Sequence, residues 1–390
     1  MKISILSSNL AQNCVGRAYI LAKTLQKKHN VEIVGPVFGE KIWDPVKDDT
    51  TIVYRSVNFS KGFRQLLQLR DLYRKIDGDV IYAGKPLFTS FGIGLIKKFF
   101  TRKPLVLDID DWEIGFKKDK YSNLKFTGKV RYFLNSIKKY YRKSSFWIMP
   151  LLEKFTGLAD KITVSSSFLQ KKFGGTLVWH GRDESILNPE NYSKPLLRKK
   201  YKINSDSKVI MFLGTPRKHK GIKDLIEAIS KIKDDKVLLI IVGVDKRKYC
   251  IDILKYAEKI ISGRFISYGL QPFQNIPEFL SMADIIVIPQ RKNYSTIGQI
   301  PAKIFDAMAM ARPIIATDVS DLPEILSNCG QIIDPGDPEK LKGAINYFLQ
   351  NPEEAEKMGK KARKRFENEY SWAKIEKILI KAIDDVKSNN

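Results

Sequence analysis

A glycine and a group of basic residues follow one strongly apolar stretch of the chain at close spacing. In VIMFLGTPRKHKG, a run typical of a buried strand ends, and Gly214, Arg217, Lys218 and Lys220 come directly after it. Glycine lets the backbone approach a ligand, arginine offers a planar fork of donors, and lysine offers a point charge. This combination suits a diphosphate, whose oxygens accept charge-assisted hydrogen bonds. The alternative interpretation is a basic surface loop.

A second informative stretch is IGQIPAKIFDAMAMARPIIATDVSDLPE, which spans residues 297–324. Pro301 suits the first turn of a helix that carries Lys303 and Asp306, and the apolar run that follows is typical of a buried parallel strand. We expect the backbone at 298–300 and the helix start to complete a phosphate cradle, because anions bind beside strand ends and helix N-termini in open α/β sheets. Lys303 either adds a charge at the phosphates or is a solvated helix residue.

Three carboxylates gather in the first half of the chain, in LVLDIDDWEIGF. Asp108, Asp110 and Asp111 come at the end of a predicted strand, where carboxylates are costly unless they bind something or face a polar site. We expect Asp110 or Asp111 to orient a substrate hydroxyl or to take its proton. Capping, or pairing with the basic segment that follows, is the alternative. Trp112 either stacks on a ligand ring or belongs to the core.

The elements that must position these residues alternate between strand and helix, which indicates parallel α/β architecture. Strands are expected at 2–6, 31–35, 52–54, 80–83, 105–110, 162–165, 177–179, 209–213, 237–242, 265–268, 285–289, 314–317 and 331–334. Helices are expected at 17–28, 62–76, 87–100, roughly 124–144, 147–157, 221–232, 247–260, 276–282, 302–310, 338–349, 353–368 and 372–386. The alternation pauses in a polar stretch with two prolines. We therefore expect two doubly wound domains, 1–181 and 201–370, with a linker at 182–200 and an interdomain cleft as the ligand site. The last helix, 372–387, is expected to pack back on the first domain.

Composition excludes several classes of protein. The chain has 390 residues, 43% of them hydrophobic, which is typical of globular domains and too long for one ordinary core. The three cysteines are scattered, so neither a disulfide framework nor a metal site is expected. The N-terminus is too polar for a signal peptide, and no stretch reaches the length of a membrane span. These features favour a cytoplasmic location, with peripheral attachment to the inner face of the cell membrane as an option.

The net charge of +25 is not spread evenly along the chain. Residues 116–150 hold ten Lys or Arg and a single acid, Asp119, with aromatic residues between them. This pattern suits an anionic membrane surface, and a solvated helix face is an equal alternative. Nucleic acid is not expected, because no DNA- or RNA-binding motif is present. The sequence does not indicate an oligomeric state.

Three of these stretches, in order, resemble the donor-binding domain of group 1 (family 4) glycosyltransferases. They are FLGTPRKHKGIKDLIEAI, YGLQPFQNIPEFLSMADIIVIPQ and PAKIFDAMAMARPIIATDVSDLPEIL, and the resemblance covers essentially all of 205–380. It is thinner in the first half, where SNLAQNCVGRAY is similar to the family's glycine loop and LADKITVSSSFLQKKFGG to its strand and helix before the linker. The resemblance implies a GT-B fold and a retaining enzyme that uses a nucleotide-sugar. A metal-binding reading of Asp108 and Asp110 belongs to a different fold, so no metal and no cofactor are expected.

The resemblance also implies roles for individual residues. Arg217 and Lys220 match the residues that hold the donor diphosphate and stabilise its departure. Asp306 falls where the family has the acid that binds the ribose. Gly16, in a loop before a helix expected to start at Arg17, would let the chain approach the donor phosphate and the acceptor.

Two positions depart from the family pattern. Gly298 stands where an acid that bonds the donor sugar is expected, beside Gln299 in the phosphate cradle. Ala311 stands where the family usually has glycine after the helix. If the backbone there needs a positive φ, alanine costs about 1 kcal/mol.

The function expected from these features is transfer of a sugar from a UDP-, GDP- or ADP-sugar to a hydroxyl of a glycan or lipid-linked acceptor. Cell-envelope glycan or glycolipid synthesis is the expected setting. Two alternatives stay open. One is a sugar-nucleotide epimerase of the same fold, and the other is a non-catalytic sugar- or lipid-binding homologue, for which Gly298 is the main argument.

Overall fold

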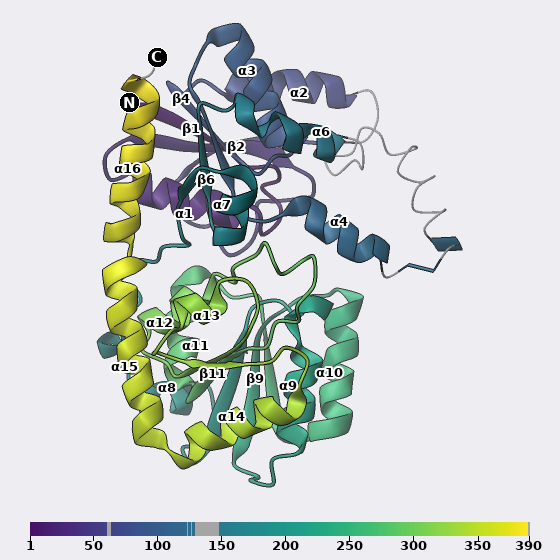
Figure 1. Cartoon of the computed structure of the whole chain (residues 1–390), viewed down its shortest axis with the longest axis vertical. Coiled ribbons are helices and arrows are strands. Elements are labelled where there is room, and N and C mark those ends of the chain that lie inside the picture. Colours follow the sequence, from purple (N-terminus) through teal and green to yellow (C-terminus); the bar gives the residue numbers. More distant parts are fainter. Residues whose placement is uncertain (61–63, 123, 126, 129–147, 389–390) are drawn as a thin grey trace. The chain divides into compact units, whose positions relative to one another are not determined.

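The computed structural model describes residues 1–60, 64–122, 124–125, 127–128 and 148–388 (Figure 1). The chain divides into two compact units. Unit 1 comprises Met1–His180, Gly298–Ile300 and Ile375–Asn390, and unit 2 comprises Gly181–Ile297 and Pro301–Lys374. No helix of the described ranges has the length and apolarity that crossing a bilayer requires.

Unit 1 is built on a parallel sheet of seven strands in the order β3-β2-β1-β4-β5-β6-β7. The strands are β1 (Lys2–Leu6), β2 (Asn30–Val37), β3 (Val53–Asn58), β4 (Val80–Gly84), β5 (Leu105–Ile109), β6 (Lys161–Val164) and β7 (Thr176–Leu177). Strand order reverses between β1 and β4, which pair with Leu6 opposite Ala83. In doubly wound sheets, ligands bind beyond the carboxyl ends of the strands at such a point.

Helices cover both faces of this sheet (Figure 1). The helical elements are α1 (Val15–Leu25), α2 (Arg64–Lys75), the π-helical η1 (Phe88–Gly92), α3 (Ile93–Thr101), α4 (Glu113–Ser122), α6 (Ile148–Lys154), η2 (Phe155–Leu158), α7 (Ser167–Phe173) and the part of α16 (Trp372–Ser388) from Ile375 onward. Helix α4 was not expected from the sequence, and α7 was expected only from the family resemblance of LADKITVSSSFLQKKFGG. In α7 the signal was local, since the Ser166 side chain accepts a hydrogen bond from the Leu169 N–H at 3.2 Å and so caps the helix. Most of the helix expected at 124–144 lies outside the described residues.

Unit 2 carries a parallel sheet of six strands in the order β10-β9-β8-β11-β12-β13. The strands are β8 (Lys208–Leu213), β9 (Val237–Val244), β10 (Phe265–Gly269), β11 (Ile285–Ile288), β12 (Ile314–Thr317) and β13 (Gln331–Ile333). The order reverses between β8 and β11, which pair directly. Apolar side chains of β8 and β9, such as Phe212 and Ile241, are fully buried in a core shared with α9, α10 and α14.

The helical elements of unit 2 complete the doubly wound pattern. They are η3 (Pro189–Asn191), α8 (Lys194–Lys200), η4 (Lys218–Lys220), α9 (Ile222–Ser230), α10 (Lys248–Ile261), η5 (Phe273–Asn275), α11 (Ile276–Met282), α12 (Lys303–Ala309), α13 (Leu322–Ile325), α14 (Pro338–Gln350), α15 (Pro352–Glu369) and the first turn of α16. Helix α8 falls within the range expected to be a linker. The expectation of two parallel, doubly wound α/β sheets is confirmed.

Candidate functional site

The basic loop of unit 2 leaves the sheet where the strand order reverses. Gly214 follows β8, donates its N–H to Val242 O at 2.7 Å and has φ of +114°, which side-chain-bearing residues rarely adopt. The glycine therefore allows the chain to turn sharply toward Arg217 and η4. Lys220 ends η4, directly before α9.

Lys303 reaches the same place from the start of α12, and its environment is unusual for a cation. The residue is 8% exposed, and its Nζ is fully buried with no hydrogen-bond partner among the described residues. Nζ lies 3.6 Å from the centroid of the Phe212 ring. A Cβ placed on Gly214 would lie 3.8 Å from Lys303 Nζ and 3.9 Å from Lys220 Nζ, so both amines border the space above this glycine.

These surroundings disfavour a proton on Lys303. Burial, followed by repulsion from Lys220, holds the pKa of Lys303 well below its usual range, and Asp306 opposes the shift weakly. A buried amine with no acceptor costs free energy. A bound anion would supply both the missing acceptor and the missing charge. The arrangement is therefore suited to binding an anion.

Arg217 is held by a group that the sequence analysis missed. Its guanidinium Nη2 contacts Asp245 Oδ2 at 3.1 Å, and Nη1 donates to Pro216 O at 2.7 Å. Asp245 follows β9 and also accepts a hydrogen bond from the Arg247 N–H at 3.0 Å. The sequence signal for Asp245 was an acid directly after a buried strand. The sequence analysis considered this signal after β5 and overlooked it after β9.

Asp306, the expected ribose ligand, forms an ion pair with Arg182. Both side chains are largely buried, at 13% and 12% exposure. The backbone of Arg182 is fixed as well, because its carbonyl accepts a hydrogen bond from the Trp372 N–H at 2.8 Å. One carboxylate can accept several hydrogen bonds, so the pair orients Asp306 and leaves acceptor capacity for a ligand.

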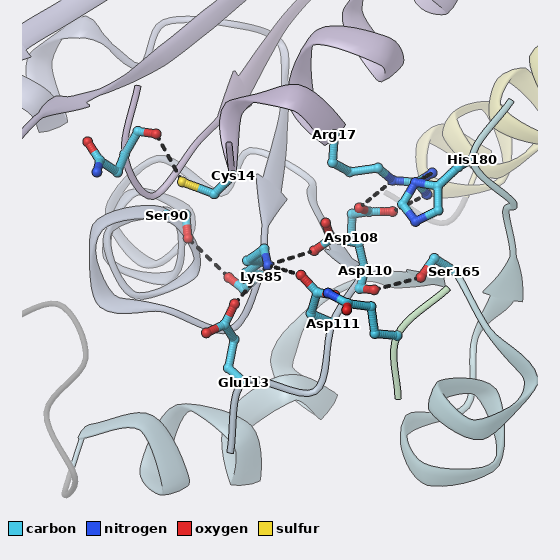
Figure 2. Close-up of polar contacts among 12 residues, drawn as sticks. Cys14, Arg17, Lys85, Ser90, Asp108, Asp110, Asp111, Glu113, Ser165 and His180 are labelled. Carbon is cyan, nitrogen blue, oxygen red and sulfur yellow. Dashed lines mark hydrogen bonds and ion pairs between the residues drawn. The ribbon is translucent and has the colours of Figure 1, made fainter. Parts of the chain in front are cut away.

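In unit 1, Asp108 has a structural role. Its carboxylate accepts two hydrogen bonds from Arg17, at 2.9 and 3.0 Å, and one from Thr163 Oγ1 at 2.8 Å. Arg17 also donates to the carbonyls of Val178 and Trp179. Figure 2 shows Arg17 between Asp108 and His180, whose Nδ1 lies 3.4 Å from the guanidinium. The fully buried pair ties α1, β5, β6 and the chain before Gly181 together. Because α1 begins at Val15, the expectation of a loop up to Gly16 is wrong, and Gly16 lies inside the first turn.

Asp110 and Asp111 surround a buried lysine that the sequence analysis also missed. Lys85 Nζ lies 2.5 Å from Asp111, 2.7 Å from Glu113 and 3.4 Å from Asp110 (Figure 2). Lys85 follows β4 in a left-handed conformation, with φ of +68°. Its N–H donates to Asp108 O at 2.7 Å and its carbonyl accepts from Ser90 Oγ at 3.0 Å, which holds the strained backbone in place.

Burial and the neighbouring charges shift the pKa values of Lys85 and Asp110 for different reasons. Burial alone would lower the pKa of Lys85, but the three carboxylates outweigh it and raise that pKa well above its usual range. Burial raises the pKa of Asp110 to about 7, against the opposing effect of Lys85. Asp110 Oδ1 is buried without a hydrogen bond, and Asp110 lines a small cavity of about 10 Å³, roughly the size of one water. Its raised pKa suits Asp110 to exchanging a proton near neutral pH.

Gly298 and Gln299 group with unit 1, whereas the other residues expected at the donor lie in unit 2. Gln299 Nε2 donates to Asp111 Oδ1 at 2.8 Å. A Cβ on Gly298 would lie 2.7 Å from Trp112 Cβ and 3.1 Å from the Phe168 ring. An acidic side chain does not fit at 298, which explains the departure from the family pattern. Trp112 itself is 8% exposed and packs on Phe168, with ring centroids 5.5 Å apart.

Within the described ranges, no three His, Cys, Asp or Glu side chains are arranged to hold a metal ion. The carboxylates that come closest to such a set enclose the ammonium of Lys85 instead.

A family model described as Glycosyl transferases group 1 matches residues 193–365. A curated relative, N-acetyl-alpha-D-glucosaminyl L-malate synthase from Bacillus anthracis, is 27% identical over 47% of this chain and 46% of its own. Alpha-maltose-1-phosphate synthase from Mycolicibacterium smegmatis is 26% identical over 51% of this chain and 52% of its own. The matched region spans about half the length of these curated relatives.

A solved structure, Anabaena HepE in complex with UDP-glucose, is similar to nearly the whole chain. The two superpose with a TM-score of 0.77 at 15% identity, over 98% of this chain and 99% of that one. At this identity the likeness shows the fold, which is GT-B. Over residues 193–365, the chain is similar to the group 1 glycosyl transferases.

Proposed function

We propose that the chain is a glycosyltransferase that binds a nucleotide-sugar in unit 2 and transfers the sugar to a hydroxyl of an acceptor. One observation carries this proposal. Lys303 Nζ is buried, has no hydrogen-bond partner among the described residues, and borders the same space as Lys220 beside Gly214. A diphosphate supplies the acceptors and the negative charge that this place lacks.

The same residues support a metal-independent reaction. A departing nucleoside diphosphate develops negative charge, which positive groups must stabilise in the transition state. Lys220 and Arg217, which Asp245 orients, supply positive charge where other enzymes use a divalent ion. Lys303 adds to this charge once a bound anion favours its protonated form. Retention of configuration rests on the family resemblance, and the anomeric configuration of the product tests it directly.

For the donor's nucleoside, we propose that Asp306 binds the ribose hydroxyls. Its ion pair with Arg182 fixes the carboxylate, and a carboxylate is an effective acceptor for hydroxyl donors. UDP-, GDP- and ADP-sugars all carry this ribose, so the contact does not select among the three.

On the acceptor side, we propose that Asp110 takes the hydroxyl proton and that Asp111 belongs to the same cluster. A pKa of about 7 suits a general base at neutral pH. Lys85 balances the negative charge that remains once the acids are ionised. Asp111, held between Lys85 and Gln299, positions the cluster.

We propose a glycan or lipid-linked acceptor in cell-envelope synthesis, at the cytoplasmic face of the membrane. The net charge of +25 and the basic, aromatic segment 116–150 support contact with anionic lipid. Most of that segment, including Lys138, Lys139, Arg142 and Lys143, lies outside the described residues. Charge reversal at these four positions should weaken vesicle binding at low salt and have little effect at high salt, where surface charges are screened.

Gly298 favours one rival function, a non-catalytic binding homologue, because the acid that bonds the donor sugar is absent and does not fit. A sugar-nucleotide epimerase is the other rival. Incubation with UDP-, GDP- and ADP-sugars, with and without a panel of glycan and lipid-linked acceptors, separates all three. Nucleoside diphosphate released in proportion to glycosylated acceptor supports the transferase. A new sugar nucleotide formed without acceptor, or donor binding without turnover on any acceptor, contradicts it.

A further inference from the structure

Helix α3 presents apolar side chains to the outside of unit 1. Phe99 is 80% exposed, Phe100 is 71% exposed, and Ile96 is also exposed. The spacing of three and four residues places them on one face of the helix. The opposite face packs against the sheet through Gly94, where a Cβ would lie 3.1 Å from Leu105, and Ile93 in the first turn is buried. The packing of α3 on the sheet therefore keeps the stripe of Ile96, Phe99 and Phe100 exposed.

A second exposed apolar stripe runs along α6 and η2. Leu151, Phe155 and Leu158 are all exposed, the last at 55%, while Leu152 between them is buried. The two stripes belong to neighbouring elements, since Lys98 Nζ on α3 donates to Leu158 O at 2.9 Å. Soluble monomers rarely leave so many large apolar side chains together. The apolar face is defined here as Ile96, Phe99, Phe100, Leu151, Phe155 and Leu158.

The charge around the apolar face is positive. The two acids beside it are neutralised, because Asp160 pairs with Lys98 and Glu153 pairs with Lys172. Arg102 at the end of α3 and Lys154 between the apolar residues of α6 are both exposed. Aromatic and aliphatic side chains ringed by Lys and Arg match the chemistry of the boundary between lipid headgroups and acyl chains.

We propose that the apolar face of unit 1 inserts into the surface of an anionic lipid membrane. The proposal deepens the proposed function, on which it rests, by naming the surface that would bring the chain to a lipid-linked acceptor. The charge of the chain argues against a second copy as the occupant, because two molecules that each carry +25 repel one another. An anionic bilayer attracts the same charge.

The test compares Phe99→Ser/Phe100→Ser with a matched control, Leu196→Ser/Ile251→Ser, which removes two exposed apolar side chains from unit 2. Each full-length protein is sedimented with vesicles of equal parts phosphatidylcholine and phosphatidylglycerol, and with pure phosphatidylcholine, at low and high salt. We expect the wild type and the control to bind the anionic vesicles. We expect the phenylalanine variant to bind about tenfold less tightly, because two large apolar side chains no longer leave water.

Two further measurements separate the possible outcomes. Light scattering without vesicles reports on self-association, and a monomeric phenylalanine variant beside a dimeric wild type would overturn the proposal in favour of a second copy. Equal vesicle binding by the variant and the wild type, or no binding by either, would also overturn it. Thermal stabilisation by UDP, GDP or ADP should be the same in all three proteins. Loss of that stabilisation in the wild type would count against the proposed function and not against the membrane surface.

Discussion

The two units each bury a lysine beyond the carboxyl ends of their sheets, and the two lysines are treated in opposite ways. Lys85 in unit 1 lies within 3.4 Å of three carboxylates. Lys303 in unit 2 is buried to the same degree beside the Phe212 ring, with no hydrogen-bond partner among the described residues. The pKa of the first is raised and that of the second is lowered.

The difference distinguishes a structural cation, which pairs with carboxylates of the fold, from a cation suited to binding a ligand. A buried charge with its counter-charges in place holds acids in position, and removing it leaves those acids uncompensated. A buried amine without an acceptor costs stability until an anion arrives. Burial alone does not distinguish these two cases. The hydrogen-bond and ion-pair partners of each lysine do distinguish them.

The largest effect should come from Lys85→Met. This change leaves Asp111 and Glu113 without their counter-charge in a largely buried cluster, which we expect to destabilise the protein by about 3–5 kcal/mol. Chemical denaturation measures the loss. Because the variant could fail to fold, Lys85→Arg serves as the control, since it keeps the charge and should retain most of the stability. Equal stability of the methionine variant and the wild type would refute the role given to Lys85.

The next largest effect should be a pH dependence of the free energy of unfolding that is caused by Asp110. Its folded pKa of about 7 lies above the value of about 3.9 expected for an unfolded chain, so the folded protein holds the extra proton between these two pH values. Wild-type stability attributable to Asp110 is therefore highest at acidic pH and falls as pH rises from about 4 to about 7. Asp110→Asn cannot ionise, so its stability relative to the wild type should increase over this window. The free energy of unfolding is measured for both proteins at about pH 4 and about pH 7. If the difference between the two proteins were the same at both pH values, Asp110 would ionise with an ordinary pKa.

Lys303→Met should behave in the opposite way to Lys85→Met. Without ligand, the variant removes an amine that has no acceptor and adds a thioether beside Phe212, so we expect it to be as stable as the wild type or more stable by about 1–2 kcal/mol. Because the folded pKa is depressed, wild-type stability should also rise with pH toward the normal lysine pKa, and the variant should lose this slope. A large loss of stability in the variant would mean that Lys303 has an undetected partner.

The smallest effect concerns Ala311, just beyond the helix that Lys303 starts. Its φ is +51°, so the left-handed conformation that the sequence analysis considered is present. Ala311→Gly should stabilise unit 2 by about 0.5–1 kcal/mol without altering either lysine. This variant shows whether a change in unit 2 stability by itself shifts donor binding. If Ala311→Gly weakened donor binding as much as Lys303→Met does, the weaker binding of Lys303→Met could not be assigned to the lost amine.

The sequence predicted the architecture well and the partners poorly. Alternating apolar runs gave β1, α11 and β12 with their observed bounds, because burial of parallel strands and of amphipathic helices leaves a periodic signal. Lys85 and Arg17 were missed because their partners are 23 or more residues away, and the Arg17–Asp108 pair spans 91 residues. Periodicity carries no information on such distant pairs. The useful signal was a charged residue inside or directly after a buried element.

Gly298 shows a different limit. The sequence showed that an expected acid was missing, and the resemblance interpreted this as a change at the donor sugar. The reason is local packing, since Trp112 and Phe168 occupy the space of a side chain. Steric exclusion by residues more than a hundred positions away is not visible in the sequence.

If Lys303 lies in the site of the donor diphosphate, replacing it should remove the contribution of the phosphates to ligand binding. The thermal midpoints of the wild type and Lys303→Met are measured with UDP, GDP and ADP, each beside its nucleoside without phosphates. At least one diphosphate should raise the wild-type midpoint more than its nucleoside does, because a bound ligand stabilises the folded state. Lys303→Met should lose most of that difference while remaining folded. A full diphosphate-dependent shift in Lys303→Met would contradict the account.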